Sequence, residues 1–282
     1  MSILEAILLG ILQGLTEFLP ISSTGHLTLA GKLMNLINPD EPYKWTSFIA
    51  VIQLGTMLAV ILYFWKDIID IVKAFLKENI ASRKKFKEQT LNSRLGWFVI
   101  IGTLPVVVIG LGFKDFIEGA FTKNLYVISL SLIVLAIILA FADKTGSYKK
   151  DITKISWLDA LIIGIAQAFA LIPGSSRSGT TITAGLFLGL DRETAARFSF
   201  LMSIPAVMAS GLLELKESLD YINFSDSINL FAATLAAAVI GYLSIEFLLR
   251  FLKKNSTFLF VYYRIILGLL ILSLILSNTI KP

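Results

Sequence analysis

A polar stretch over residues 13–26, set inside a hydrophobic run near the N-terminus, constrains this chain more than any other feature. It carries the carboxylate Glu17, two serines, a threonine and the only histidine of the chain. Each apolar arm beside it is shorter than the roughly 20 residues that a helix needs to cross a bilayer. The segment from Pro20 to Gly25 also disfavours one straight helix. We therefore predict a re-entrant hairpin over 3–36, two half-helices that enter and leave the membrane by the same face. Irregular backbone at membrane depth persists only where it is buried in protein or lines a wet cavity, so the loop is a candidate site.

The composition places the chain in a membrane. Of its 282 residues, 56% are hydrophobic and only 16% are charged, whereas a soluble domain carries about 25% charged residues. Long apolar segments recur throughout, which indicates a polytopic helical membrane protein. The N-terminus is not predicted to be a signal peptide, because it lacks a basic first region and its apolar run contains Glu5, Gln13 and Glu17. The chain has no cysteine, which excludes disulfides and thiolate metal sites.

A second broken apolar segment repeats the first. Gln13 recurs as Gln167, and Pro20-x-Ser-Ser recurs as Pro173-x-Ser-Ser. We predict an all-α polytopic membrane protein of two inverted repeats, each a re-entrant helical hairpin plus three transmembrane helices, with six spans and four half-helices. The second repeat must be inverted because three spans is an odd number. The first repeat, 1–142, contains the hairpin 3–36 and spans at about 45–65, 95–113 and 125–141; the second, 143–282, contains the hairpin 157–190 and spans at about 195–213, 228–249 and 258–276.

The basic residues predict the orientation of these spans. A net charge of +5 would suggest a nucleic-acid partner for a soluble protein, but most of the 25 Lys and Arg lie between spans, so no nucleic-acid partner is expected. The predicted charged loop 66–94 and the basic loop 143–156 fall on one side, which the positive-inside rule assigns to the cytoplasm. Both termini are then outside. The first hairpin enters from outside and the second from the cytoplasm, so that their tips meet near the middle of the membrane.

The two predicted tips suit a phosphate. Hydroxyl side chains that can cap the following helix stand at both: Ser22, Ser23 and Thr24 before the helix expected near His26, and Ser175 and Ser176 before the one expected near Ser178. A helix N-terminus offers free N–H groups and the positive end of a dipole, which favour an anion. Arg177 adds a planar fork that matches phosphate oxygens. Two such half-sites facing each other suit a diphosphate, or one phosphoryl group with its leaving group.

A carboxylate and a histidine are candidate reactive groups. Glu17 lies one turn after Gln13, on the same side of the half-helix, and a carboxylate beside a phosphate can hold a hard divalent cation or act as a base. His26 can transfer a proton or attack phosphorus. A serine-rich turn is often only a cap, and a lone histidine is often structural. The site hypothesis depends on the convergence of Glu17, His26 and Arg177 on the two loops, since charges inside a membrane are costly.

Other polar residues of the spans have structural alternatives. Glu246 and Arg264 can form a structural ion pair, and Arg197 is expected to cap or snorkel near the cytoplasmic end of its helix. Gln53 and Ser203 occupy equivalent positions of the repeat, where helix–helix hydrogen bonds and pocket lining are both open.

At these residues the chain resembles the undecaprenyl pyrophosphate phosphatase family, bacterial membrane enzymes linked to bacitracin resistance. The family pattern (Glu/Gln)-x-x-x-Glu stands here as Gln13-Gly-Leu-Thr-Glu17, and its Pro-Gly-x-Ser-Arg-Ser-Gly-x-Thr pattern stands over 173–181. Similarity also covers 52–55 and 196–205, and hence essentially the whole chain. Gln13 stands where many members carry glutamate, which weakens position 13 as a negative metal ligand.

The resemblance implies hydrolysis of a phosphoric anhydride, from undecaprenyl pyrophosphate to undecaprenyl phosphate plus inorganic phosphate, which recycles the lipid carrier for cell-wall synthesis. It implies a multi-pass protein of the bacterial inner membrane, in contact with membrane lipids, whose site opens to the outer, periplasmic face. It also implies a divalent cation, Mg²⁺ or Ca²⁺, held by Glu17 with Gln13 as a second candidate ligand. A homodimer stays open.

Within this scheme Arg177 and the helix N-termini would stabilise charge on the transferring phosphoryl group. Ser23 or His26 would attack, and His26 would shuttle the proton if Ser23 attacks. The residues predicted to be catalytic are Glu17, Ser23, His26 and Arg177, and those predicted to bind substrate are Gln13, Ser22, Thr24, Gly174, Ser176, Ser178 and Thr181.

Two other functions compete with this one. A transporter or flippase for an anionic lipid or a small anion would use the same inverted plan. The phosphatidate-phosphatase superfamily, the other large class of membrane lipid phosphatases, needs two catalytic histidines, whereas this chain has one histidine. We set the second alternative aside.

Overall fold

Helices build this protein, as predicted. The structure is a computed structural model that describes residues 1–38, 40–113, 117, 119–219 and 224–281. Within these ranges it contains helices and no strand of a sheet, apart from one isolated bridge between Lys150 and Leu190. The all-α prediction is confirmed.

Six helices of the described residues are long and apolar enough to cross a membrane. Large apolar side chains on their outer faces, such as Val108, Phe231 and Ile266, are exposed in the monomer, as expected for surfaces that face lipid tails. The six predicted spans and the multi-pass membrane protein are therefore confirmed. The helices are α3 (Pro42–Tyr63), α5 (Leu91–Gly112), α7 (Leu125–Thr145), α10 (Arg192–Ser218), α11 (Phe224–Leu252) and α12 (Phe258–Leu276).

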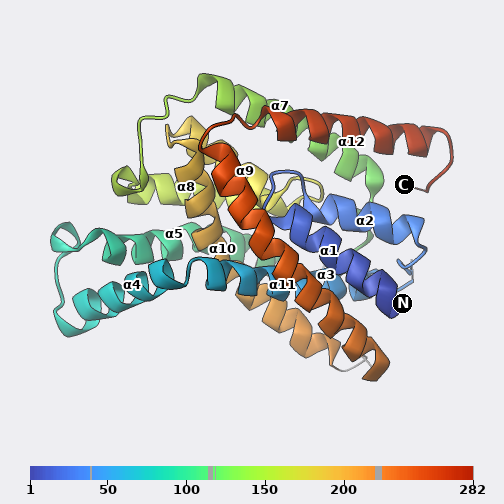
Figure 1. The fold of residues 1–282 in the computed structure, drawn as a ribbon, viewed down its shortest axis with the longest axis horizontal. Helices are drawn as coiled ribbons and strands as arrows, with labels where there is room; N and C mark the ends of the chain where they lie inside the picture. Colours follow the sequence, from blue (N-terminus) through green and yellow to red (C-terminus); the bar gives the residue numbers. More distant parts are fainter. Residues whose placement is uncertain (39, 114–116, 118, 220–223, 282) are drawn as a thin grey trace.

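The two broken segments form pairs of shorter helices. The first pair is α1 (Ile3–Glu17) and α2 (Ser23–Leu33); α1 runs inward from the N-terminus and α2 returns toward the same side (Figure 1). The second pair is α8 (Trp157–Ala168) and α9 (Arg177–Phe187), with the 3₁₀ turn η5 (Phe169–Leu171) after α8. Both predicted helix breaks are confirmed.

The predicted charged loop 66–94 is wrong in part, because it contains a helix. The helix α4 (Trp65–Leu76) follows α3 directly and packs along α5. Its charged residues favour a loop when read alone, but they recur among apolar residues as in an amphipathic helix. The buried carboxylate of Glu78 then closes the connection: it accepts a hydrogen bond from the backbone N–H of Thr90 at 2.8 Å, which holds the pKa of Glu78 below its usual value. The remaining short turns of the connections are η1 (Lys77–Ala81), η2 (Phe86–Glu88), η3 (Ala120–Lys123) and η4 (Ile152–Lys154).

Each hairpin packs closely on a spanning helix of the other half of the chain. Helix α1 lies on α11, and α8 lies on α5. A glycine permits each contact: a Cβ at Gly10 would lie 2.2 Å from the Ala233 carbonyl oxygen, and one at Gly164 would lie 2.3 Å from the Gly102 carbonyl oxygen. Corresponding helices thus pack in corresponding ways, which fits two repeats. The inversion of one repeat relative to the other stays a prediction.

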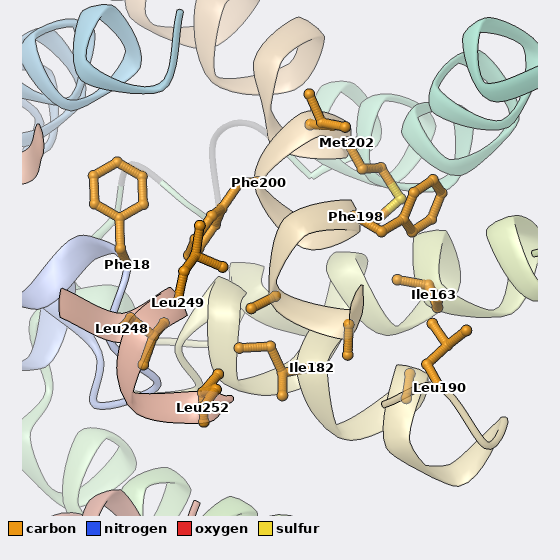
Figure 2. Close-up of a cluster of buried hydrophobic side chains, with 14 of the residues drawn as sticks. Phe18, Ile163, Ile182, Leu190, Phe198, Phe200, Met202, Leu248, Leu249 and Leu252 are labelled. Carbon is orange, nitrogen blue, oxygen red and sulfur yellow. The ribbon is translucent and has the colours of Figure 1, made fainter. Parts of the chain in front are cut away.

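An apolar core fixes the backbone beside the first tip. Phe18 follows Glu17 directly and is almost fully buried, and its ring meets that of Phe200 edge to face at 5.2 Å. Figure 2 shows these rings in one cluster with side chains from α9, α10 and α11, including Ile182 and Leu249. This packing restricts the backbone position of Glu17, which precedes Phe18.

The two termini lie at the same end of the molecule. Figure 1 shows the N and C marks on one side and the connection between α4 and α5 at the far side. An even number of spans requires such an arrangement, and the basic residues of 77–88 then lie away from both termini. Which end faces the outside stays a prediction.

Candidate functional site

The two hairpin tips form the same backbone turn. Ser22 is the N-cap of α2 and Ser176 is the N-cap of α9, with φ of 74° and 70°. Each serine hydroxyl accepts a hydrogen bond from a glycine N–H three residues on: Gly25 to Ser22 at 3.2 Å and Gly179 to Ser176 at 3.1 Å. The predicted caps are confirmed at these two serines. A positive φ is uncommon for a residue with a side chain and marks a constrained turn.

The turns also settle how the hairpins correspond. Aligning the prolines places Ser22 opposite Ser175, whereas the capping role places it opposite Ser176, because the second hairpin has one more residue between its proline and its cap. The first residue of the following helix is then Ser23 in one hairpin and Arg177 in the other.

Glu17 connects the two hairpins. Its Oε2 accepts hydrogen bonds from the Ser23 hydroxyl at 2.6 Å and from the Gln13 amide at 3.0 Å, and its Oε1 accepts from Arg177 Nη2 at 2.9 Å. The carboxylate is only 6% exposed. A buried charge requires such compensation. Three residues predicted to be catalytic, Glu17, Ser23 and Arg177, therefore lie together.

Arg177 has a hydrogen-bond donor that no described protein group uses. Its Nη2 donates to Glu17, while Nη1 is buried and has no partner in the part of the chain that the structure describes. A guanidinium presents its N–H groups in a rigid fork, so Nη1 is ready for an anion once one arrives.

A cavity of about 360 Å³ lies beside these groups. One part of its wall is polar and comes from the tips; the rest is mainly apolar and comes from α5, η5 and α10. An anionic head joined to an apolar tail would match this division. The predicted site residues in the wall are Glu17, Ser22, Ser23, Thr24, Gly174, Ser176 and Arg177.

Three residues predicted to bind substrate lie outside this wall. Gln13 donates to Glu17, Ser178 donates to the Leu19 carbonyl oxygen at 2.9 Å, and Thr181 shares a hydrogen bond with Ser199 at 2.6 Å. The Gln13 bond lies within α1, and the bonds of Ser178 and Thr181 join α9 to other segments, so the three residues stabilise the tips from outside the cavity.

His26 has both ring nitrogens engaged. Nδ1 lies 2.7 Å from the Ser22 carbonyl oxygen and Nε2 lies 2.7 Å from the Tyr263 hydroxyl, with the two rings stacked at 5.5 Å. A carbonyl oxygen only accepts, so Nδ1 carries a proton. These contacts hold the turn of the first hairpin to α12, and His26 lies outside the cavity wall.

Arg264 is the residue that sequence reasoning placed wrongly. It pairs not with Glu246 but with backbone: its guanidinium donates to five carbonyl oxygens, and its side chain is fully buried. Glu246 instead pairs with Arg250 and accepts from the Tyr63 hydroxyl. The acceptors of Arg264 belong to both tips and to α7: Pro20, Gly174, Ser175, Ser131 and Leu132.

The position of Arg264 adds positive charge behind the two tips. Among the described residues no carboxylate forms an ion pair with it. A signal was available in the sequence, since an arginine in the middle of an apolar span needs either a counter-charge or carbonyl oxygens. The sequence could not decide between them.

The structure also places the three other polar residues of the spans for which alternatives were open. Arg197 pairs with Asp67 of α4 at 2.8 Å and lies over the Phe64 ring, and its snorkelling stays a prediction. Gln53 lines the cavity, which confirms the pocket-lining alternative for this residue. Ser203 donates to the Phe200 carbonyl oxygen within its own helix at 2.7 Å.

Known proteins match this chain over nearly its whole length. The family model described as bacitracin resistance protein BacA matches residues 6–270. The chain is 60% identical over 268 residues to an undecaprenyl-diphosphatase of Syntrophobacter fumaroxidans, covering 95% of each chain. It is 50% identical to enzymes of the same name from Chlorobium phaeovibrioides, covering 100% of each chain, and from Myxococcus xanthus, covering 100% of this chain and 92% of that one.

The chain belongs to the BacA family. The resemblance inferred from the two motifs is thereby confirmed, and in this BacA-family protein both motifs lie at the cavity described above.

One residue of this BacA-family site was missed. Gln167 was noted only as the repeat of Gln13, yet it lines the cavity, and its side-chain amide is buried. The repeat itself was the signal that could have found it, because the first copy lies one turn from Glu17.

The residues present can hold a divalent cation in one way. The described residues contain no group of three His, Cys, Asp or Glu side chains suited to a metal. Gln13 Oε1, however, is a buried carbonyl oxygen without a partner among the described residues, on the amide whose Nε2 donates to Glu17. Mg²⁺ is commonly held by one or two carboxylates together with substrate phosphates, so this oxygen pair fits a cation that arrives with a diphosphate.

Proposed function

We propose that this chain is an undecaprenyl-diphosphatase, a hydrolase that converts undecaprenyl pyrophosphate to undecaprenyl phosphate and inorganic phosphate and thereby recycles the lipid carrier. Relatives of that name at 50–60% identity support it. The observation that carries it is the group Ser23–Glu17–Arg177 between two helix N-termini, beside a cavity with an apolar wall.

Ser23 is the proposed nucleophile. Its hydroxyl donates to Glu17 Oε2 at 2.6 Å, which is the geometry of a nucleophile and its general base. The Ser23 oxygen attacks the terminal phosphorus while its proton passes to Glu17. The anhydride P–O bond breaks, and the polyprenyl monophosphate leaves with that proton, which returns Glu17 to its carboxylate form. A water molecule, deprotonated by Glu17, then attacks the phosphoserine; the Ser23–phosphorus bond breaks, Ser23 takes the proton back from Glu17, and inorganic phosphate is released.

Charge stabilisation comes from both tips. The N-termini of α2 and α9 present free N–H groups, and Arg177 Nη1 is an unused donor. These groups stabilise the charge of the transferring phosphoryl group, which is the main contribution a protein makes to phosphoryl transfer. His26, in this scheme, orients the turn through Ser22 and does not attack.

A divalent cation is part of the proposal. Glu17 would hold it, with Gln13 Oε1 as the second protein ligand, and bound there it would neutralise charge on the diphosphate. Ser23 and Arg177 would keep their roles, since both are placed by the helix that follows each tip.

The proposed setting is the bacterial inner membrane, with the cavity open to the outer face. The cavity wall includes Leu111 at the end of α5, Ile117 beyond that helix, and Leu213 and Glu214 near the end of α10. These ends point to the side that the basic loops predict to be outside. A polyprenyl diphosphate could enter there from the outer leaflet. A homodimer stays an open prediction.

Phosphate release tests the activity. We expect the purified protein to release inorganic phosphate from long polyprenyl diphosphates, EDTA to suppress the release, and Mg²⁺ or Ca²⁺ to restore it. Full activity in chelator would refute the metal role of Glu17. Substrate movement across proteoliposomes without hydrolysis would instead support the transporter alternative.

Cysteine labelling tests the orientation. The chain has no native cysteine, and the side chains of Ser82, Ser147, Asn38 and Thr279 are exposed. In intact cells an impermeant thiol reagent should label single cysteines at Asn38 and Thr279 but not those at Ser82 and Ser147. Labelling with the reverse pattern would invert the proposed topology.

A further inference from the structure

Gln167 is a buried amide that the protein leaves without hydrogen bonds. Its side chain is 1% exposed, and neither Nε2 nor Oε1 has a partner among the described residues. It belongs to α8 and lines the cavity beside the tips. Buried amides are nearly always hydrogen-bonded, because an unsatisfied one destabilises the fold. An amide in this state on a cavity wall indicates that a ligand supplies the missing bonds.

The corresponding residue of the first hairpin shows why Gln167 is free. Gln13 donates its Nε2 to Glu17, one turn further along the helix. Four residues after Gln167 the chain has Leu171, whose side chain cannot accept a hydrogen bond. The amide donor of the second hairpin is therefore available to a substrate, whereas that of the first is committed to the carboxylate.

The location of Gln167 in the wall indicates which part of a substrate it meets. Ser23 and Glu17, at the first tip, fix the phosphorus that reacts. Gln167 comes from the other hairpin, and the wall next to it continues with Ala170 and Leu171 and with the apolar residues of α5. A donor at the border between the polar tips and an apolar wall faces the place where a phosphate joins a prenyl chain.

We infer that Gln167 Nε2 donates to the phosphate that stays on the prenyl chain. This inference rests on the proposed function and deepens it, since it makes Gln167 a substrate- and product-binding residue. The terminal phosphate is then held by the first tip and Arg177, and the ester-linked phosphate by Gln167. A diphosphate satisfies both sets of donors, and the lipid monophosphate product keeps only one.

The test is Gln167→Leu, a substitution that removes the amide and keeps an apolar side chain of similar volume. A hydrogen bond to a charged group corresponds to roughly a tenfold to hundredfold change in affinity. We expect KM for polyprenyl diphosphate and the Kd of polyprenyl monophosphate each to rise about tenfold. The Ki of inorganic phosphate should stay unchanged, because inorganic phosphate binds at the first tip. The melting temperature in detergent should stay equal or rise, because an unsatisfied buried amide has been removed.

Two further variants keep the test decisive. Gln167→Glu has the same shape but replaces the donor with a negative charge, so it should weaken binding of both lipids more than Gln167→Leu does. Gln89→Leu is the matched control outside the site: this amide donates to Asn79 at 2.8 Å and accepts from Ser93 at 3.1 Å. It should lower the melting temperature and leave KM unchanged.

Two results would overturn the inference. A lower melting temperature of Gln167→Leu with unchanged KM would make Gln167 structural. A raised Ki of inorganic phosphate with unchanged binding of polyprenyl monophosphate would assign it to the other phosphate. Binding of the monophosphate is measured without turnover, so failure here is distinct from failure of the proposed hydrolysis.

Discussion

At the first residue of the helix after each tip, the first hairpin carries Ser23 and the second carries Arg177. The turns before them are alike, with a serine cap at positive φ and a glycine N–H bound to its hydroxyl. One turn after the repeated glutamine, the first hairpin has Glu17 and the second has Leu171. The same scaffold thus presents the proposed nucleophile with its proposed base on one side, and a guanidinium with an unpartnered amide on the other.

This difference between the hairpins shows how two repeats with the same backbone can carry different functional groups. Two helix N-termini provide two equivalent places for phosphate oxygens. In the proposed mechanism, the different residues at these equivalent positions decide which phosphate reacts and which is only held. Glu17 makes the two halves depend on each other, because it binds Ser23 through one oxygen and Arg177 through the other.

Removing the reactive side of this comparison should have the largest effect. We expect Ser23→Ala to fold and to lose at least about three decades of kcat, because among the described residues no other hydroxyl donates to the Glu17 carboxylate. Phosphate release and detergent melting curves measure the two quantities. His26→Asn is the companion variant: it should lower kcat much less than Ser23→Ala does. A greater loss in His26→Asn than in Ser23→Ala would make His26 the nucleophile.

Altering the binding side should have the next largest effect. Arg177→Lys keeps the charge but loses the planar fork that joins Glu17 and the phosphate. We expect it to fold normally and to lose at least about two decades of kcat, the usual effect of removing one transition-state donor. Arg177→Ala should lose more. A well-folded Arg177→Lys protein within about threefold of wild-type turnover would refute this account of the second tip.

Changing the shared turn should have the smallest effect, and an equal one in both hairpins. Ser22→Gly and Ser176→Gly each remove a cap but relieve a positive φ. A cap replaced by glycine costs a few tenths of a kcal/mol, and the relieved strain is roughly 1 kcal/mol. We therefore expect both variants to melt at or slightly above the wild-type temperature. Opposite shifts in the two variants would show that the turns are not equivalent.

The sequence predicted the fold well because the signals were strong. Long apolar runs gave the six spans, and the Pro20 and Pro173 breaks gave the hairpins. The helix α4 was missed because its charges were assigned to a loop, although its apolar residues recur at helical spacing. A charged stretch between spans is ambiguous until the period of its apolar residues is read.

The sequence predicts which charged residues belong to the site, but it does not predict which atoms they contact. Charged groups in an apolar run are informative, so Glu17 and Arg177 were found and lie together. Side-chain direction is not visible in a sequence, so the contacts of His26 with Tyr263 could not be predicted. The carbonyl partners of Arg264 were hidden for the same reason, because any backbone can supply them.

The crossed packing of the hairpins has a consequence for how the protein is made. Helix α1 is synthesised first, but its neighbour α11 and the Arg264 that secures both tips come near the end of the chain. During translation the first hairpin therefore waits, with its polar tip unpartnered, until α11 and α12 have been synthesised. Arg264, one of these native contacts, lies 244 residues after Pro20 of the first tip.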